Sequence, residues 1–151
     1  MAKARLFVLA QFGLLAALVL LHRDEAVQAP SWFQPIAIAL IALAVVVLFI
    51  AVINLRKALT ASPIPKADAA LIQVGIYKYI RHPMYTAVIM IGGGITLNNP
   101  TLFTIIAWVA LIIVLLNKAH YEDKLLLSKH LNAAKYQKDT GTFLPKLSRS
   151  K

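Results

Sequence analysis

The chain has 151 residues, of which 60% are apolar and only 15% are charged, and it contains no cysteine. Soluble domains have about 45–50% apolar and about 25% charged residues, so the mean hydropathy of +0.72 points to an integral membrane protein. The composition excludes a disordered chain, and the missing cysteines exclude a disulfide framework and any thiolate nucleophile or thiolate metal site. We predict a single membrane domain over residues 1–151 and no metal site.

Four apolar segments follow one another, at residues 4–21, 36–53, 84–97 and 101–116. The first two have 18 residues each, close to the roughly 20 needed to span a membrane. The third and fourth are separated only by the turn sequence Asn98-Asn99-Pro100, which predicts a tight antiparallel hairpin, either crossing or re-entrant. We therefore predict an all-α membrane protein with four transmembrane helices and a partly helical basic tail.

Two details of these segments have alternative explanations. The first segment resembles a signal peptide because it has a basic start and is followed by Val27-Gln28-Ala29, but its length and Pro30 argue against cleavage. Three consecutive glycines at positions 92–94 fit close helix packing or a loosened turn beside a cavity, and we favour packing.

The net charge of +10 follows membrane topology and does not indicate a nucleic-acid partner. Of the 16 basic residues, two lie at the start of the first segment, five in residues 54–83, eight after residue 116 and one in the remaining connections. This alternation obeys the positive-inside rule. It predicts that both termini are cytoplasmic and that the basic face attracts anionic membrane lipids. The short chain is typical of a prokaryotic inner-membrane protein.

Polar clusters at residues 75–85 and 117–126 flank the predicted hairpin, which should bring them together. Pro83 suits the first turn of a helix and pushes His82 out of helical conformation, leaving N–H groups free for an anion. Lys118 and Glu122 share a helix face at i, i+4. These side chains form a receptor that suits a zwitterion, with Arg81 and His82 for a carboxylate and Glu122 for an ammonium group.

Each side chain also has a simpler explanation. Lys118 and Glu122 can form an ion pair with each other, and His82 can be an interfacial or capping residue. The other basic and aromatic residues can be interfacial anchors, namely Lys78, Arg81, Tyr77, Tyr79, Tyr85 and Tyr121.

The order and spacing of these residues resemble the isoprenylcysteine carboxyl methyltransferase family and the related phospholipid methyltransferases. The matching positions are Gly75, Tyr77, Arg81, His82, Pro83, Tyr85, Asn99, Pro100, Glu122, Asp123, Leu126, Tyr136, Leu144 and Pro145. The resemblance covers residues 68–147, while residues 1–57 supply two further helices.

The resemblance implies an integral membrane methyltransferase that uses S-adenosylmethionine. The cofactor would be bound by Leu71, Ile72, Tyr77, His82, Pro83, Met84, Tyr85 and Glu122. Catalysis would involve Glu122, Lys118 and Arg81. Lys118 stands where prenylcysteine methyltransferases carry an arginine for the substrate carboxylate, and a lysine weakens bidentate recognition.

The acceptor is therefore a lipophilic small molecule or a lipid, and we favour a carboxylate such as that of an isoprenylcysteine. A lipid amine is the alternative acceptor. A non-catalytic membrane subunit with the same fold is a further alternative. A transporter is disfavoured because the first two segments carry no ionisable side chain at mid-membrane.

Overall fold

The computed structural model describes residues 2–21, 29–55 and 71–146, and every regular element within them is helical. The elements are α1 (Ala2–Leu21), α2 (Phe33–Leu55), the 3-10 helix η2 (Gly75–Lys78), α3 (Pro83–Asn98), α4 (Leu102–Lys129) and α5 (Ala133–Asp139). The all-α prediction is confirmed for these residues. Residues 27 and 28 of the possible cleavage site lie outside them, as does residue 68, where the predicted motif region starts.

Three helices, α1, α2 and α4, are long and apolar enough to cross a membrane. The predicted ends of the first three apolar segments agree with the observed helices to within three residues, but α4 continues past residue 116 to Lys129. At 16 residues, α3 is shorter than the roughly 20 residues of a typical span. That α3 also crosses the membrane stays a prediction.

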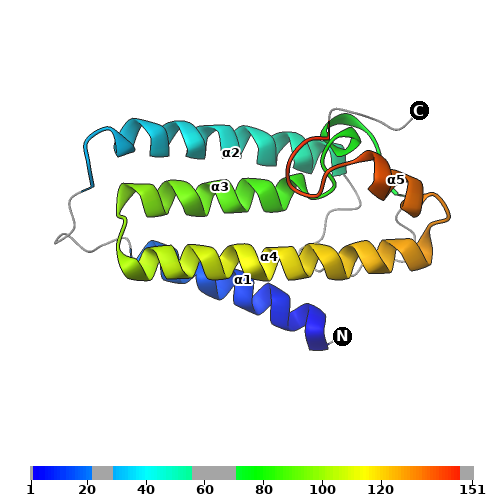
Figure 1. The fold of residues 1–151 in the computed structure, drawn as a ribbon, viewed down its shortest axis with the longest axis horizontal. Helices are drawn as coiled ribbons and strands as arrows, with labels where there is room; N and C mark the ends of the chain where they lie inside the picture. Colours follow the sequence, from blue (N-terminus) through cyan, green and yellow to red (C-terminus); the bar gives the residue numbers. More distant parts are fainter. Residues whose placement is uncertain (1, 22–28, 56–70, 147–151) are drawn as a thin grey trace.

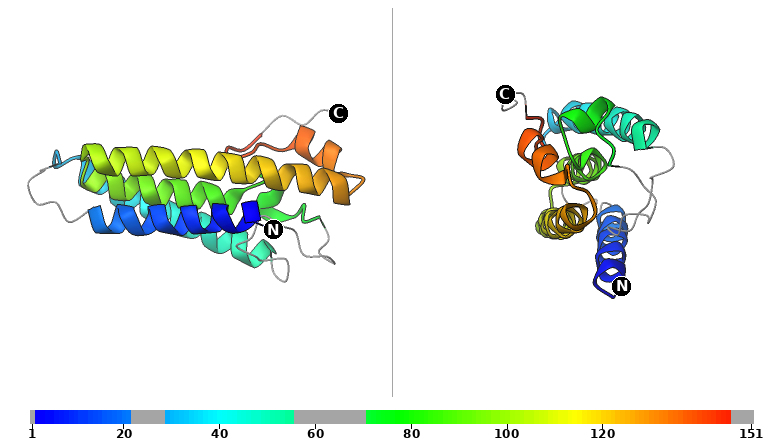
Figure 2. Two further views of the ribbon diagram at one scale, coloured as in Figure 1. Left: turned by 90° about the horizontal axis from the view of Figure 1, so that it is seen from below. Right: turned by 90° about the vertical axis from the view of Figure 1, so that its right-hand side faces the viewer.

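The four long helices lie side by side, with α3 between α2 and α4 and with α1 against α4 (Figures 1 and 2). The start of α1, the end of α2, the start of α3 and the end of α4 lie at the same end of the bundle as η2 and α5 (Figure 1). We call this the polar end. Three residues join α3 to α4 at the opposite end, where the Thr101 side chain caps α4 by accepting from the Thr104 amide at 3.1 Å.

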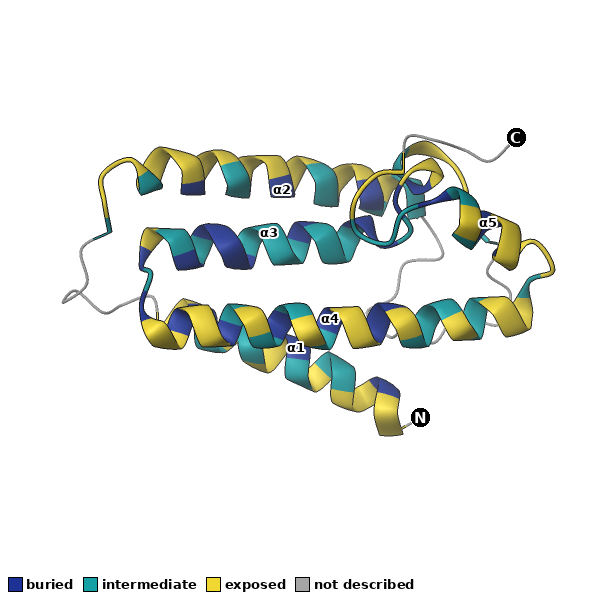
Figure 3. Ribbon diagram, viewed as in Figure 1, coloured by how far each residue is buried: buried dark blue, intermediate teal, exposed yellow. Residues whose placement is uncertain are grey.

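Buried residues recur at every seventh position on α1 and α2, and those on α2 are all alanine. The buried residues of α1 are Ala4, Gln11 and Leu18, and those of α2 are Ala37, Ala44 and Ala51. This spacing is typical of helices that pack nearly parallel, and alanines allow close approach between membrane helices. The outward faces carry exposed leucine, isoleucine, valine and phenylalanine side chains (Figure 3), as expected for contact with lipid.

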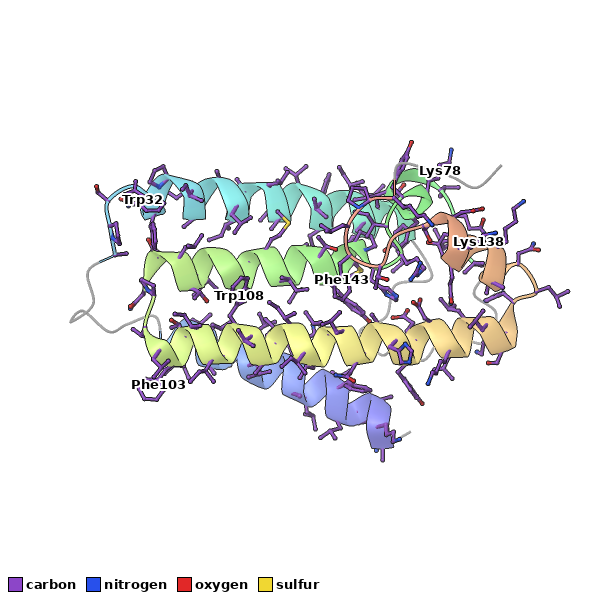
Figure 4. All side chains as sticks on the ribbon, in the orientation of Figure 1. Trp32, Lys78, Phe103, Trp108, Lys138 and Phe143 are labelled. Carbon is purple, nitrogen blue, oxygen red and sulfur yellow. The ribbon has the colours of Figure 1, made fainter. Side chains whose placement is uncertain are left out.

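The three glycines of α3 allow this close approach on two sides. A Cβ atom on Gly94 would lie 2.5 Å from Cγ1 of Ile41 on α2, and one on Gly92 would lie 2.9 Å from Cδ1 of Trp108 on α4. The Trp108 side chain projects between α3 and α4 (Figure 4), where its Nε1 donates to the Ile89 carbonyl at 2.9 Å. The prediction of close packing at residues 92–94 is confirmed.

We predict that Gly94→Ala destabilises the bundle, because its methyl group would overlap Ile41. Over-packing of this kind costs about 1–3 kcal/mol of unfolding free energy. Gly13→Ala is the matched control, since a Cβ there meets no atom within 4 Å, and alanine favours a helix by about 1 kcal/mol. Equilibrium unfolding in mixed micelles, followed by circular dichroism, measures both. Equal stability of the two variants would contradict the prediction.

Candidate active site at the polar end of the bundle

The continuation of α4 past its apolar part places Lys118, Glu122 and Asp123 on one helix. Opposite them, α3 begins at Pro83, and His82 precedes it with φ −122° and ψ 57°, outside the helical region. Both predictions about Pro83 and His82 are confirmed. The Tyr85 amide donates to the His82 carbonyl at 3.0 Å, so the first turn of α3 retains fewer free N–H groups than predicted.

His82 is buried between the two acids of α4. Its Nε2 lies 3.0 Å from Asp123 Oδ1, and its Nδ1 lies 3.6 Å from Glu122 Oε2. The Tyr85 hydroxyl donates to the same Glu122 oxygen at 2.8 Å. The His82 and Tyr85 rings stack with their centroids 5.2 Å apart and their planes 5° apart. The two polar segments flanking the predicted hairpin are therefore neighbours.

The Arg81 guanidinium binds the segment after α5. Its Nε donates to Asp123 Oδ2 at 3.2 Å, its Nη1 to the Gln137 carbonyl at 2.8 Å and its Nη2 to Thr142 Oγ1 at 2.8 Å. Nη1 also donates to the Thr140 carbonyl. A role for Arg81 in binding a substrate carboxylate stays a prediction, because the contacts described here are to the protein itself.

Residues 140–146, which we call the tail segment, pair with the backbone that leads into α3. The amides of Arg81 and His82 donate to the carbonyls of Gly141 and Thr142 at 2.8 and 3.1 Å, and the Gly141 amide donates to the Tyr79 carbonyl at 3.0 Å. Phe143 of this segment lies edge-on to the His82 ring, with centroids 6.3 Å apart, near the start of α3 (Figure 4). The tail segment therefore covers His82.

Lys118 is the largest fully buried side chain, with 1% of its surface exposed. Its Nζ donates to Gln11 Oε1 on α1 at 2.6 Å and lies 4.9 Å from the centroid of the Tyr85 ring. Among the described residues it forms no salt bridge with Glu122. The simple ion pair between Lys118 and Glu122 is thus not formed, and the Tyr85 side chain contacts both residues instead.

Glu122 is better placed than Asp123 to bind a ligand. Asp123 uses both carboxylate oxygens, one for His82 and one for Arg81, and 13% of its side chain is exposed. Glu122 uses Oε2 for Tyr85, while Oε1 makes no hydrogen bond to the described residues, and 25% of the side chain is exposed. Glu122 therefore has one oxygen without a hydrogen-bond partner among the described residues, and this oxygen can accept from an ammonium group.

Two tyrosines of the predicted motif join η2 to α5. The Tyr136 hydroxyl donates to the Tyr77 carbonyl at 2.9 Å, and both side chains are buried. Burial raises the pKa of both phenols above the usual value of 10, and the nearby Glu122 carboxylate adds to the rise. Both hydroxyls are neutral at pH 7, so Tyr136 keeps its donor role.

The other residues assigned to a cofactor by sequence have less direct structural support. Leu71 and Ile72 are half-buried before η2, Pro83 is buried, and Met84 is half-buried on the first turn of α3. Their contact with a cofactor stays a prediction. Sequence reasoning missed Gln11, Thr142 and Phe143. Gln11 had a weak signal, since it is the one uncharged polar side chain within residues 4–21.

We predict that Arg81→Gln releases the tail segment. Loss of a charged donor from these largely buried contacts costs about 3 kcal/mol, and trypsin should then cleave after Lys138 much faster. Arg5→Gln is the control, because Arg5 is exposed at the start of α1. Tryptic digestion in micelles, followed by mass spectrometry, measures the rate. Unchanged cleavage after Lys138 would contradict the structural role of Arg81.

Comparison with known proteins supports the resemblance inferred from the motif. The profile of the isoprenylcysteine carboxyl methyltransferase (ICMT) family matches residues 36–128, more than half of the chain. A search of curated protein sequences found no match. The matched range includes most of α2, all of α3 and almost all of α4, so it takes in His82, Tyr85, Lys118 and Glu122. The chain therefore belongs to the isoprenylcysteine carboxyl methyltransferase family, a family of membrane methyltransferases.

Proposed function

We propose that this protein transfers a methyl group from S-adenosylmethionine to the carboxylate of an apolar, membrane-embedded acceptor of the isoprenylcysteine type. The observation that carries the proposal is the separation of two opposite charges by one side chain. The ammonium of Lys118 lies over the Tyr85 ring, and the Glu122 carboxylate accepts from the Tyr85 hydroxyl. A cationic group of one ligand can therefore bind next to Glu122, and an anionic group of another ligand can bind next to Lys118, on the other side of Tyr85.

The residues present fit the cofactor. The Glu122 oxygen that makes no hydrogen bond to the described residues suits an ammonium group, and His82, bonded to Asp123 and close to Glu122, would hold that carboxylate in position. The proposed cofactor-binding residues are Leu71, Ile72, Tyr77, His82, Pro83, Met84, Tyr85 and Glu122. When bound, the cofactor supplies a methyl group that its sulfonium already activates.

The protein then has mainly to orient the acceptor, which is a large effect when two reactants are held in line. A carboxylate is ionised at pH 7 and needs no general base. Lys118 would hold it by a charge-assisted hydrogen bond in a buried position, where such bonds are strong. An ammonium-bearing acceptor would be repelled by Lys118. Arg81 would act through the tail segment and Asp123, which it holds.

We further propose that α3 crosses the membrane with the other helices and that the polar end is cytoplasmic. The labelled Lys78 and Lys138 lie at the polar end, while Trp32 and Phe103 lie at the opposite end (Figure 4), which fits the positive-inside rule and an aromatic interfacial belt. Both termini would then be cytoplasmic. The packing of α1 on α4 and of α2 on α3 supports a single domain for residues 1–57 and 68–147.

We predict that His82→Asn and Glu122→Gln each weaken binding of S-adenosylmethionine. Loss of a hydrogen bond to a charged group costs about 1.5–3 kcal/mol, or roughly ten- to a hundred-fold in affinity. Isothermal titration calorimetry in micelles measures this effect. His120→Asn is the matched control, because His120 is an exposed histidine on α4, the helix that carries Glu122. Unchanged affinity in both variants, with folding intact, would refute the assigned cofactor site.

For the acceptor, we predict that Lys118→Ala lowers kcat/KM by roughly ten- to a hundred-fold and leaves cofactor affinity unchanged. Lys118→Arg should preserve or improve activity, because a guanidinium suits a carboxylate. Labelled-methyl transfer to prenylcysteine analogues and to membrane lipids, assayed in parallel, measures both variants, with Lys124→Ala as an exposed control. Activity of Lys118→Ala that equals or exceeds the wild type would instead favour an amine acceptor.

A further inference from the structure

The buried face of α1 carries one polar side chain. Gln11 lies seven residues after Ala4 and seven before Leu18, and only 8% of its surface is exposed. Leu18 is fully buried in an apolar cluster with Leu111 and Leu115 of α4. Packing alone would favour an apolar residue at position 11, because a buried polar group is costly unless it is hydrogen-bonded.

The partner of Gln11 is the buried lysine. Oε1 of Gln11 accepts from Lys118 Nζ at 2.6 Å. The oxygen and the NH₂ group of an amide are attached to the same carbon. Because the oxygen accepts from Lys118, the NH₂ group of Gln11 lies close to the ammonium. That nitrogen makes no hydrogen bond to any residue in the part of the chain that the structure describes. Two N–H groups of Gln11 are thus free next to a cation.

The combination has the chemistry of a carboxylate receptor. A carboxylate is bound best by two adjacent donors, one for each oxygen, as an arginine supplies them. A lysine is a point charge and offers no such fork. The ammonium of Lys118 and the amide NH₂ of Gln11 together provide one charged and one neutral donor, and the low dielectric of their surroundings strengthens both.

We infer that Gln11 of α1 is a second binding residue for the carboxylate of the methyl acceptor and forms a two-donor receptor with Lys118. The inference rests on the proposed function, whose acceptor it defines more closely as a carboxylate bound through both oxygens. Gln11 lies outside residues 36–128, the range that the family profile matches. Gln11 would thus determine which acceptor binds, and its substitution should leave the proposed cofactor site around Glu122 unchanged.

The alternative is that Gln11 only holds α1 against α4. Hydrogen bonds between membrane helices contribute to stability, so a purely structural role would affect stability and not the binding of a carboxylate. The two roles are distinguished by kinetics with a defined probe. N-acetyl-S-farnesylcysteine is the test acceptor with a free carboxylate, and its methyl ester, the product of the proposed reaction, is tested as a competitor that lacks the anion.

The experiment compares Gln11→Leu and Gln11→Glu with the wild type in labelled-methyl transfer. Loss of one donor to a carboxylate should raise the KM for the acid roughly ten-fold, while the inhibition constant of the methyl ester changes less than two-fold. Gln11→Glu should raise the KM further, because its carboxylate would occupy the Lys118 ammonium. Adding Lys118→Arg to Gln11→Leu should recover most of the loss, because a guanidinium supplies both donors.

Leu18→Ala is the control for docking of α1, since it removes apolar packing against α4 and leaves the polar pair intact. It should lower stability without changing the ratio of the two constants. An unchanged KM in Gln11→Leu, an equal loss for the acid and the ester, or no rescue by Lys118→Arg would overturn the inference alone. Absence of cofactor binding or of methyl transfer in the wild type would overturn the proposed function instead.

Discussion

Arginine cannot lose its charge in a protein, and this one property of Arg81 organises the polar end of the molecule. A buried guanidinium must have its donors satisfied, since an unpaired buried charge is very costly. Arg81 meets this requirement with Asp123 and with oxygen atoms of Gln137, Thr140 and Thr142. The path of the chain after α5 is therefore set by the need to surround one cation, and the tail segment covers His82 as a consequence.

The pairing of Arg81 also gives the two acids of α4 different roles. Asp123 neutralises Arg81 and lies against His82, so both its oxygens are used within the protein. Glu122 keeps one oxygen free of hydrogen bonds to the described residues. Adjacent acids on a helix point in different directions, about 100° apart, and this difference separates a structural carboxylate from one that can meet a ligand. Tyr85 then holds Glu122 through its hydroxyl and contacts Lys118 with its ring.

Much of this arrangement could be predicted from local sequence. Apolar length marked the helices, Pro83 marked the start of α3, and the turn at residues 98–100 implied that the polar clusters meet. The spacing of Lys118 and Glu122 also indicated a helix after residue 116, but the unbroken run of α4 to Lys129 was not predicted, because charged residues interrupt its apolar pattern although they favour a helix. The pairing of the tail segment with residues 79–82 could not be predicted from a local pattern, because the backbone hydrogen bonds between them join residues about 60 positions apart in the sequence.

Gln11 shows why the remaining part of the site could not be predicted. It contacts Lys118 across 107 positions of sequence, and a single glutamine in an apolar helix has no period that predicts its partner. Yet the lysine requires it, because Lys118 is buried and the Tyr85 ring offers only its face. The contacts of His82 and Tyr85 with Glu122 join the start of α3 to α4 without α1, whereas Lys118 has its partner only when α1 packs on α4. A change in α1 can therefore alter the groups around Lys118 while His82, Tyr85 and Glu122 keep their contacts, so under the proposed function the choice of acceptor can change without loss of cofactor binding.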